Sequence, residues 1–585
     1  MTLPAGYDTP GARIETARGG SICEGAADGL GSMIVAENVI VSDTAGVRRR
    51  TVLAGGAVAA AGAGLALAAP AWASTPVFRH GVASGDPLPD AVIIWTRVTV
   101  AEDATPGLGT GAAAAVRWEV AADENFAAIT ASGSATATAD SDHTVKVDVT
   151  GLAPGCVYFY RFTALGRRSP VGRTRTAPAL GATPDRLRFG VVSCANWEAG
   201  FFAAYRHLAD RGDLDAIVHL GDYLYEYGRG EYGGRTGSAR PHDPVHEIVS
   251  LADYRIRHAQ YKTDPDLQRL HALLPFICTW DDHESADNSW SGGSGKHDPA
   301  SQGSWADRKA ASARAYLEWM PVRASRSGSG VQIYRRLRFG TLAELSMLDL
   351  RSYRDQEVKP GAGWREVDDP ERTLTGRAQM DWLTAGLASS TARWKLVGNS
   401  VMIAPLVFPP LDPATTAAFT QALGVPQSGL PVNADQWDGY TADRARLYRA
   451  ITEHGVSDVV FLTGDIHSSW AADLPVNAAD PAGPGVGAEF VVPSVTSSSL
   501  GEVLQAPPRT AAVPVEEAIK GVNRHLRYVE LDSHGFGVLE VTSAQAQMDW
   551  FYVLDVADAR TGVRHGASFA VPAGGRMEPR TAPAS

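Results

Sequence analysis

Between Phe78 and Thr176, hydrophobic and polar positions alternate in four short segments. They cover residues 91–98, 115–120, 144–149 and 157–163, and Gly, Pro and Asp separate them. A period of two over such lengths is typical of half-buried β-strands. The spacing therefore predicts a small β-sandwich over residues 74–178.

A different pattern follows a Pro-containing linker near residue 180. The predicted strands are 187–192, 216–220, 276–280, 345–348, 394–397 and 459–462, and the predicted helices are 201–210, 251–261, 378–387 and 442–453. Three further strands of antiparallel character are predicted at 527–531, 537–541 and 548–553. The alternation predicts an α/β domain over residues 185–560, with two mixed sheets flanked by helices, and a tail over 561–585.

The first 73 residues carry an export pattern. Three arginines at 48–50 precede an uncharged run of Ala, Gly, Val and Leu that ends in Ala-Trp-Ala at 71–73. This predicts a twin-arginine signal peptide over 48–73, in preference to a transmembrane anchor or a buried helix. Residues 1–47 are an N-terminal extension or the product of a wrongly assigned start, with Met33 as one later candidate. We expect a bacterial protein, secreted or in the cell envelope, that meets the twin-arginine translocase during export and has no membrane span after processing.

Composition narrows the classes of function. The chain has 585 residues, of which 44% are apolar, and a formal net charge of −12. This length suits one large catalytic core plus a smaller domain. The charges are scattered, without the basic footprint of nucleic-acid binders, so no nucleic-acid recognition surface is expected.

Four of the predicted strands run directly into polar clusters. These are Ser-Cys-Ala-Asn at 193–196, Gly-Asp-Tyr-Leu-Tyr-Glu at 221–226, Asp-Asp-His-Glu at 281–284 and Gly-Asp-Ile-His at 464–467. The carboxyl ends of neighbouring strands converge on one rim in α/β sheets, so these clusters can meet. Carboxylates and imidazole bind hard or borderline ions, and a thiolate or phenolate suits iron. A glycine before Asp222 and before Asp465 would let the chain turn sharply.

Each of these residues also has an ordinary explanation when it is taken alone. An Asp after Gly is often a turn or a helix cap, and a lone cysteine is usually a small buried hydrophobe. A tyrosine is more often an aromatic core residue, and a histidine is more often a satisfied buried one. Four such clusters at four strand ends are not explained in this way, so the sequence predicts a metal centre.

The order of the clusters resembles the calcineurin-like metallophosphoesterase pattern, with specific departures. Ser-Cys replaces Asp-x-His, Asp-Asp-His-Glu replaces Gly-Asn-His-Asp/Glu, and Gly-Asp-Ile-His replaces Gly-His-x-His. These three replacements resemble the motifs of the alkaline phosphatase D (PhoD-like) family. So do Phe-Arg-His-Gly-Val-Ala-Ser-Gly-Asp-Pro at 78–87 and Ile-Trp-Thr-Arg at 94–97. The resemblance extends through Trp-Asp-Gly-Tyr at 437–440, Pro-Ser-Val-Thr-Ser at 493–497 and His-Gly-Phe-Gly at 534–537, and so covers nearly all of the mature chain.

The resemblance implies a fold, a metal content and a reaction. The fold is a four-layer αββα calcineurin-like metallophosphatase core with an N-terminal fibronectin-like β-sandwich, and the metals are Fe3+ and Ca2+. By motif, Fe3+ would be bound by Cys194, Asp222 and Tyr225, and the site would be completed by Asp282, Asp465 and His467. The implied activity is hydrolysis of phosphomonoesters, phosphodiesters or both by a metal-activated water or oxo nucleophile.

Three further residues are candidates for contact with the phosphoester substrate. His283 would contact the phosphate or protonate the leaving oxygen, or else it would only support the site. Asn288 and Arg257 are weaker candidates for phosphate contact; a guanidinium can bind two phosphate oxygens, but Arg257 lies on a predicted helix whose exposed face can simply be solvated. Neither a triad-like Ser or Thr nucleophile nor a P-loop stands out in the sequence, which favours direct metal-assisted hydrolysis.

Two other functions fit parts of the sequence. A phospholipase D-like phosphodiesterase would use the same metal site, with the long segments 227–247 and 289–303 as lids or substrate walls. A non-catalytic envelope binding module would account for the N-terminal strands but not for the four clusters. Such a module is expected to purify without stoichiometric iron.

Overall fold

The computed structural model describes residues 15–16, 76–101, 104–235, 237–327, 330–359, 366–406 and 433–584. The predicted signal peptide lies outside the described residues. Those from 76 onward belong to one compact unit. Within this part of the chain, every helix is too short or too polar to cross a membrane.

The N-terminal part is built from antiparallel strands, as the alternation of polar and apolar residues predicts. The four predicted strands are β3 (Ala91–Arg97), β4 (Ala114–Ala121), β6 (Thr144–Thr150) and β7 (Val157–Ala164). The others are β1 (Glu15–Thr16), β2 (Val82–Gly85), β5 (Ile129–Ala137), β8 (Arg167–Arg168) and β9 (Gly172–Arg175). One sheet has the order β1-β5-β4-β7-β8, with β9 on β7. Every second residue of β7 is buried, so the period of two marks the face that packs.

Two mixed sheets form the centre of the molecule. A ten-stranded sheet has the order β25-β24-β23-β22-β10-β11-β12-β2-β3-β6, and a seven-stranded sheet has the order β15-β16-β17-β18-β20-β19-β21. The first adds β10 (Arg186–Val192), β11 (Ala216–His219), β12 (Pro275–Cys278), β22 (Gly535–Thr542), β23 (Gln545–Val553), β24 (Val563–Pro572) and β25 (Glu578–Arg580). The second contains β15 (Arg335–Phe339), β16 (Ala343–Met347), β17 (Trp394–Asn399), β18 (Val459–Thr463), β19 (Ser469–Pro475), β20 (Gly485–Val491) and β21 (Leu526–Glu530).

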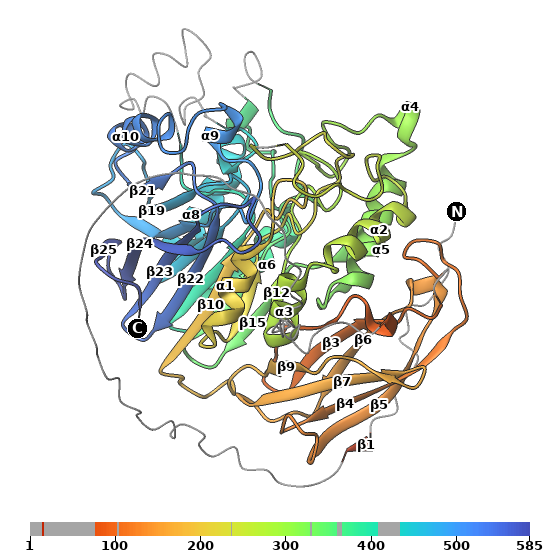
Figure 1. The fold of residues 1–585 in the computed structure, drawn as a ribbon. Coiled ribbons are helices and arrows are strands. Elements are labelled where there is room, and N and C mark those ends of the chain that lie inside the picture. The colour runs from red at the N-terminus through yellow and green to blue at the C-terminus, as the bar shows by residue number, and fades with distance from the viewer. Residues whose placement is uncertain are drawn as a thin grey trace, which may run out of the picture. The chain divides into compact units, whose positions relative to one another are not determined.

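Helices cover the outer face of each sheet (Figure 1). On the ten-stranded sheet these are α1 (Ala203–Arg211), α2 (Leu251–Tyr261), α3 (Pro265–Leu273) and α5 (Trp305–Trp319). On the seven-stranded sheet they are α6 (Arg377–Ser389), α8 (Thr441–Glu453) and α10 (Ala512–Val522). Two short helices, α4 (Pro299–Gln302) and α9 (Leu500–Val503), lie in connecting segments.

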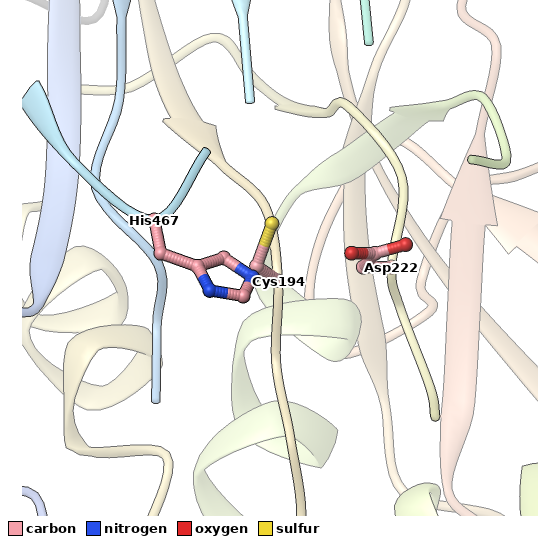
Figure 2. A group of neighbouring side chains, drawn as sticks. All are labelled: Cys194, Asp222 and His467. Carbon is pink, nitrogen blue, oxygen red and sulfur yellow. The ribbon is translucent and has the colours of Figure 1, made fainter. Parts of the chain in front are cut away.

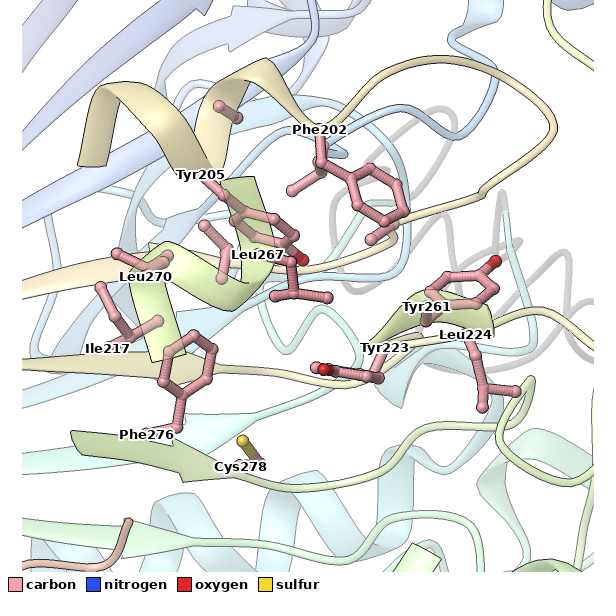
Figure 3. Packing of buried hydrophobic residues seen from close by; sticks show 14 of the residues in the cluster. Phe202, Tyr205, Ile217, Tyr223, Leu224, Tyr261, Leu267, Leu270, Phe276 and Cys278 are labelled. Atoms are coloured by element: carbon pink, nitrogen blue, oxygen red, sulfur yellow. The ribbon is translucent and has the colours of Figure 1, made fainter. Parts of the chain in front are cut away.

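Apolar side chains fill the spaces between the layers. Phe189, Leu345 and Trp550 belong to the cluster between the two sheets. A second cluster packs Tyr205 and Leu267 of the helices onto Phe276 of the ten-stranded sheet (Figure 3). The expected four-layer αββα arrangement is therefore confirmed.

The N-terminal strands share a sheet with the α/β core. β2 pairs in parallel with β12, with Ser84 opposite Pro275, and β3 and β6 continue the same sheet. The boundary drawn between 74–178 and 185–560 therefore separates segments of sequence but not separate sheets. Hydrogen bonds between distant strands leave no local pattern in the sequence, which is why this continuity was not predicted.

Residues 561–585 are not a separate tail. They contribute β24 and β25, and β24 pairs antiparallel with the whole length of β23. Phe569 of β24 lies against Tyr528 and Trp550, with ring centroids 5.6 and 6.2 Å away. The strand β24 was not predicted because only some of its positions are buried and its alternation of polar and apolar residues is weak.

Candidate metal centre

The four polar clusters meet at the carboxyl ends of the two sheets. The neighbouring parallel strands β10, β11 and β12 end just before Cys194, Asp222 and Asp282. β18 of the other sheet ends just before Asp465 and His467. One rim therefore collects residues that are up to 273 positions apart, from residue 194 to residue 467.

One group combines sulfur, oxygen and nitrogen donors. Ligand atoms of Cys194, Asp222 and His467 lie within 4.8 Å of one another (Figure 2). Tyr225 joins this group, because its hydroxyl donates to Asp222 Oδ2 at 3.0 Å and lies 3.2 Å from His467 Nε2. A thiolate, a phenolate, a carboxylate and an imidazole together are a donor set that suits iron.

Carboxylates dominate the adjoining groups. Oxygens of Asp222, Asp281, Asp282 and Asp465 lie within 4.8 Å of one another, and Asp222, Asp282 and His283 form a third set. Such oxygen-rich sets suit Ca2+. Asp222 belongs to all three groups found among the described residues. It is therefore the carboxylate that the candidate groups share.

Four candidate ligands have a strained backbone. Their φ angles lie in the left-handed region, at 60° for Cys194, 54° for Asp222, 62° for Asp465 and 51° for His467. Each such residue costs roughly 1–3 kcal/mol, and strain of this kind clusters at functional sites. This backbone strain supports a functional role for the rim independently of the residue types.

The two glycines before the aspartates serve different needs. Gly221 has a φ of 110°, and a Cβ added there would lie 2.5 Å from Asp281 Cβ. A Cβ on Gly464 would lie 2.6 Å from Ser193 Oγ, although this residue is not left-handed. The sharp turn predicted from sequence thus occurs at Gly221. Gly464 is required by the close approach of the two sheets.

The candidate site at the rim buries several acidic groups close together, so a bound cation would stabilise their charged forms. Burial raises the pKa of Asp222 and of Asp465 well above the usual carboxyl range, and neighbouring aspartates add to this effect. Burial, with Asp222 and Asp465 nearby, also raises the pKa of the Cys194 thiol. These groups would keep protons unless a cation replaced them. Asp222 Oδ1 is buried without a hydrogen-bond partner among the described residues, which fits a metal ligand.

The candidate ligand His467 is held in its neutral form. Its Nδ1 lies 2.9 Å from the carbonyl oxygen of Ser498, so a proton on Nδ1 leaves the Nε2 lone pair facing Tyr225. Burial lowers the pKa of His467 to about 4. Metal-binding histidines have this form, with the second ring nitrogen bonded to a protein oxygen.

Arg351 is a central residue of the site that the sequence reading missed. Its guanidinium donates to both oxygens of Asp281 at 2.6 and 2.8 Å, to Asp435 at 3.0 Å and to Asp465 at 3.1 Å. Although burial raises the pKa of Asp281, the contact with Arg351 lowers it. Arg351 follows the end of β16, so the same strand-end rule could have found it.

His283 lies beside the candidate ligands and is held by a buried carboxylate. Its Nδ1 is 2.7 Å from Glu226 Oε2, and its backbone N–H donates to Asp282 Oδ1 at 3.0 Å. Although burial lowers the pKa of His283, Asp282 and Glu226 raise it well above its usual value. Glu226, which the sequence reading also missed, fixes this ring and leaves Nε2 available.

The structure places the other two predicted substrate contacts differently. Asn288 lies at the site, because its backbone N–H donates to Asp282 Oδ2 at 2.5 Å. Arg257 does not offer a free guanidinium, since it is fully buried and donates to the carbonyl oxygens of Tyr225, Tyr227 and Asp243. The prediction that Arg257 contacts phosphate is corrected here: this side chain holds the main chain around Tyr225.

Tyr227 of the first predicted wall segment lies beside His283, and Lys296 of the second segment contacts Tyr227. The ring of Tyr227 is 5.3 Å from the His283 ring and 5.1 Å from the ring of Tyr232. Lys296, from the second segment, lies 4.3 Å from the centre of the Tyr227 ring. The first segment thus reaches the edge of the candidate metal centre, and the second packs against it.

Comparisons with known proteins agree with this geometry. Residues 189–550 match the family described as PhoD-like phosphatase, and residues 64–178 match its N-terminal domain. Alkaline phosphatase D of Bacillus subtilis (strain 168) is 37% identical over 538 residues, which cover 89% of this chain and 87% of that protein. A solved structure entitled "Structure of PhoD" is 36% identical with a TM-score of 0.77, covering 88% of this chain and 94% of that one.

Proposed function

Because this chain belongs to the PhoD-like phosphatase family and is a phosphoester hydrolase, we propose that it cleaves phosphomonoesters, phosphodiesters or both at the metal centre described above. The observation that carries the proposal is the convergence of Cys194, Asp222, Tyr225 and His467 with buried carboxylates at one rim. The proposal includes which ions are bound and which class of phosphoester is cleaved.

We assign Fe3+ to the mixed donor group and Ca2+ to the carboxylate group. Cys194, Tyr225 and His467 would hold Fe3+, with Asp222 shared between the ions, and Asp282 and Asp465 would hold Ca2+. Bound ions would neutralise charge on the phosphoryl oxygens and activate a water for attack. Asp281 is a poorer ligand, because Arg351 occupies both of its oxygens.

His283 is the candidate acid for the leaving group. Glu226 accepts from Nδ1 and thereby fixes the ring, so that Nε2 can donate a proton to the departing oxygen. Asn288 is a candidate contact for the phosphate. Changing Glu226 to Gln should lower kcat by about 10²- to 10⁴-fold, the usual contribution of an acid or base. An unchanged kcat would rule out this role for the pair.

A non-catalytic binding module does not account for the chain. The family match over residues 189–550 includes all four polar clusters, whereas a module would explain only the N-terminal strands. A phospholipase D-like phosphodiesterase remains an outcome of the substrate test, because it would use the same site.

We also propose export through the twin-arginine route, with release outside the cytoplasm or retention in the cell envelope. The support is the sequence pattern at 48–73 alone, which lies outside the described residues. Replacing the arginines at 48–50 by lysine should leave the protein in the cytoplasmic fraction. Normal export of that variant would contradict the proposal.

Cys194→Ala and Cys278→Ala make a matched pair for testing the metal centre. Both cysteines are free and buried, but Cys278 packs in the apolar cluster beneath α3 (Figure 3). Metal content and hydrolysis of paired chromogenic phosphomonoester and phosphodiester substrates should be measured on wild type and both variants. We expect wild type and Cys278→Ala to bind iron and cleave at least one ester, and Cys194→Ala to lose both properties.

Either result is informative. Loss of iron and activity in Cys194→Ala alone would support the site, and the preferred ester would narrow the substrate class. Absence of iron and of hydrolysis in wild type, even after addition of Fe3+ and Ca2+, would overturn the proposal.

A further inference from the structure

Two sequence motifs with no part in the proposed chemistry meet next to the candidate ligands Cys194 and His467. Ser494 belongs to the Pro-Ser-Val-Thr-Ser motif after β20, and His534 begins the His-Gly-Phe-Gly motif before β22. His534 Nδ1 lies 2.9 Å from Ser494 Oγ, and Gly535 N–H donates to the Ser494 carbonyl at 2.9 Å. Glu502 Oε2 lies 3.2 Å from the other ring nitrogen, Nε2.

These three residues have the types of a nucleophilic triad but not its geometry. Ser494 is fully buried, and its hydroxyl donates to the Ser497 carbonyl at 2.6 Å. Its one proton is therefore used within the segment, and its oxygen accepts from His534 Nδ1. A nucleophilic serine must instead give its proton to the histidine and reach the substrate. The arrangement therefore points to a supporting role.

The segment between Ser494 and Ser499 contacts two candidate metal ligands. The backbone N–H groups of Thr496 and Ser497 both donate to the Cys194 carbonyl at 3.3 Å, and Ser497 Oγ donates to it at 3.1 Å. The Ser498 carbonyl lies 2.9 Å from His467 Nδ1. A shift of this short segment would therefore move both ligands.

His534 holds this segment at both ends. Its Nδ1 is hydrogen-bonded to Ser494 at the start, and its Nε2 lies at ion-pair distance, 3.2 Å, from Glu502 Oε2 without an aligned hydrogen bond. Glu502 Oε2 also accepts from Ser499 N–H at 3.3 Å. The side chains of His534 and Glu502 are each only 8% exposed, so water competes little for these contacts. A single imidazole thus fixes the length and orientation of the segment.

We propose that His534, together with Ser494 and Glu502, positions the ligands of the metal centre. The Ser498 carbonyl sets the ring orientation and the tautomer of His467, and the paired N–H groups set the strained backbone of Cys194. Partners that orient metal ligands typically change metal affinity or activity by about 10- to 100-fold when removed. This inference rests on the proposed metal-dependent function.

The test compares variants of His534 and Ser494 with a variant of a matched histidine elsewhere in the chain. His565 in β24 makes a similar bond to a serine, with Nε2 2.8 Å from Ser568 Oγ. Binding of Fe3+ should be measured on the full chain by chelator competition, and the absorption band from thiolate or phenolate to iron should be recorded. The thermal midpoint of each metal-free protein reports folding independently of metal.

We expect Ser494→Ala and His534→Ala to weaken Fe3+ binding by about 10- to 100-fold and to shift the absorption band. His534→Asn should bind more tightly than His534→Ala, because its amide can still donate to Ser494 from the position of Nδ1. His565→Ala should match wild type in affinity and spectrum. If His534→Ala does not fold, Ser494→Ala decides the outcome, because it removes a single oxygen.

Wild-type affinity and spectrum in Ser494→Ala and in a folded His534→Ala would overturn the inference while leaving the metal centre intact. An equal loss in His565→Ala would also overturn it, because the effect would then be general. Failure of wild type itself to bind Fe3+ would overturn the proposed function and this inference together.

Discussion

At the scale of single residues, the candidate site holds many buried carboxylates and few cationic side chains to offset their charge. Arg351 donates hydrogen bonds to three carboxylates, lies 3.8 Å from a fourth, that of Asp282, and is only 3% exposed. Removing one partner of a buried ion pair is costly, since the remaining charge keeps its desolvation penalty without compensation. Arg351 therefore stabilises the metal-free protein.

Arg351→Met should lower the free energy of unfolding of the metal-free protein by about 3–5 kcal/mol. Bound Ca2+ should restore part of this loss, because added cations offset the same carboxylates. Thermal unfolding with and without Ca2+ measures both effects.

Arg308→Met is the matched control for this experiment. Arg308 is also buried and pairs with Glu247 at 2.7 Å, and Glu247 is not a candidate ligand. A similar loss of stability that Ca2+ does not restore is expected. If Ca2+ restored the stability of both variants equally, the proposed role of Arg351 in offsetting the charge of the candidate ligands would be contradicted.

At the scale of elements, the junction of α2 and α3 buries a lysine among polar and aromatic side chains. Lys262 Nζ lies 2.9 Å from His271 Nε2, and 4.9 and 5.2 Å from the rings of Trp95 and Tyr223. Burial lowers the pKa of Lys262 to about 7. The aromatic rings favour the charged form and offset part of this shift. The titratable neighbours are His80, His219, His258, His271, Tyr223 and Cys278.

The shift of Lys262 predicts a pH dependence of stability. Its pKa is lower in the folded state than the unfolded value of roughly 10.4, so between about pH 7 and 10 the unfolded state binds more protons. Stability from this group therefore rises with pH in that window, by at most about 1.4 kcal/mol per pH unit.

Lys262→Met should flatten the rise and stabilise the protein most at pH 7 and below. Urea unfolding of wild type and variant at several pH values measures the difference. A steeper slope in the variant would contradict the assigned shift. Lys359, which is exposed, serves as the control position for loss of a lysine.

At the scale of the whole molecule, the N-terminal strands and the α/β core are joined by more than one contact. β2 pairs with β12, and Trp95 Nε1 donates to the Glu318 carbonyl of α5 at 2.8 Å. Asp86 forms a buried ion pair with Arg335. The two parts therefore depend on each other for burial of their shared sheet.

We expect calorimetry to show one unfolding transition for the residues from 76 onward. A protein lacking residues 76–184 should be insoluble or partly unfolded, because the edge of β12 and the ring of Trp319 would be exposed. Two separate transitions, or a stable truncated core, would contradict this prediction.

The sequence by itself determined the elements and the residue types of the candidate site. Strand and helix periods are local, so β3, β7, α2 and β18 were predicted close to their observed bounds. Ligand types at strand ends are also local, and the rule that parallel strands end at one rim brought them together in advance.

Tertiary structure alone decided how these parts combine. It groups His467 with Cys194 and Asp222, brings Arg351 from the other sheet among the aspartates, and turns Arg257 away to backbone carbonyls. It also joins β2 to β12 and adds β24 to the core. The physical reason is the same in each case: pairing between distant strands and contacts between buried charges depend on distance through space, and they leave no periodic trace along the chain.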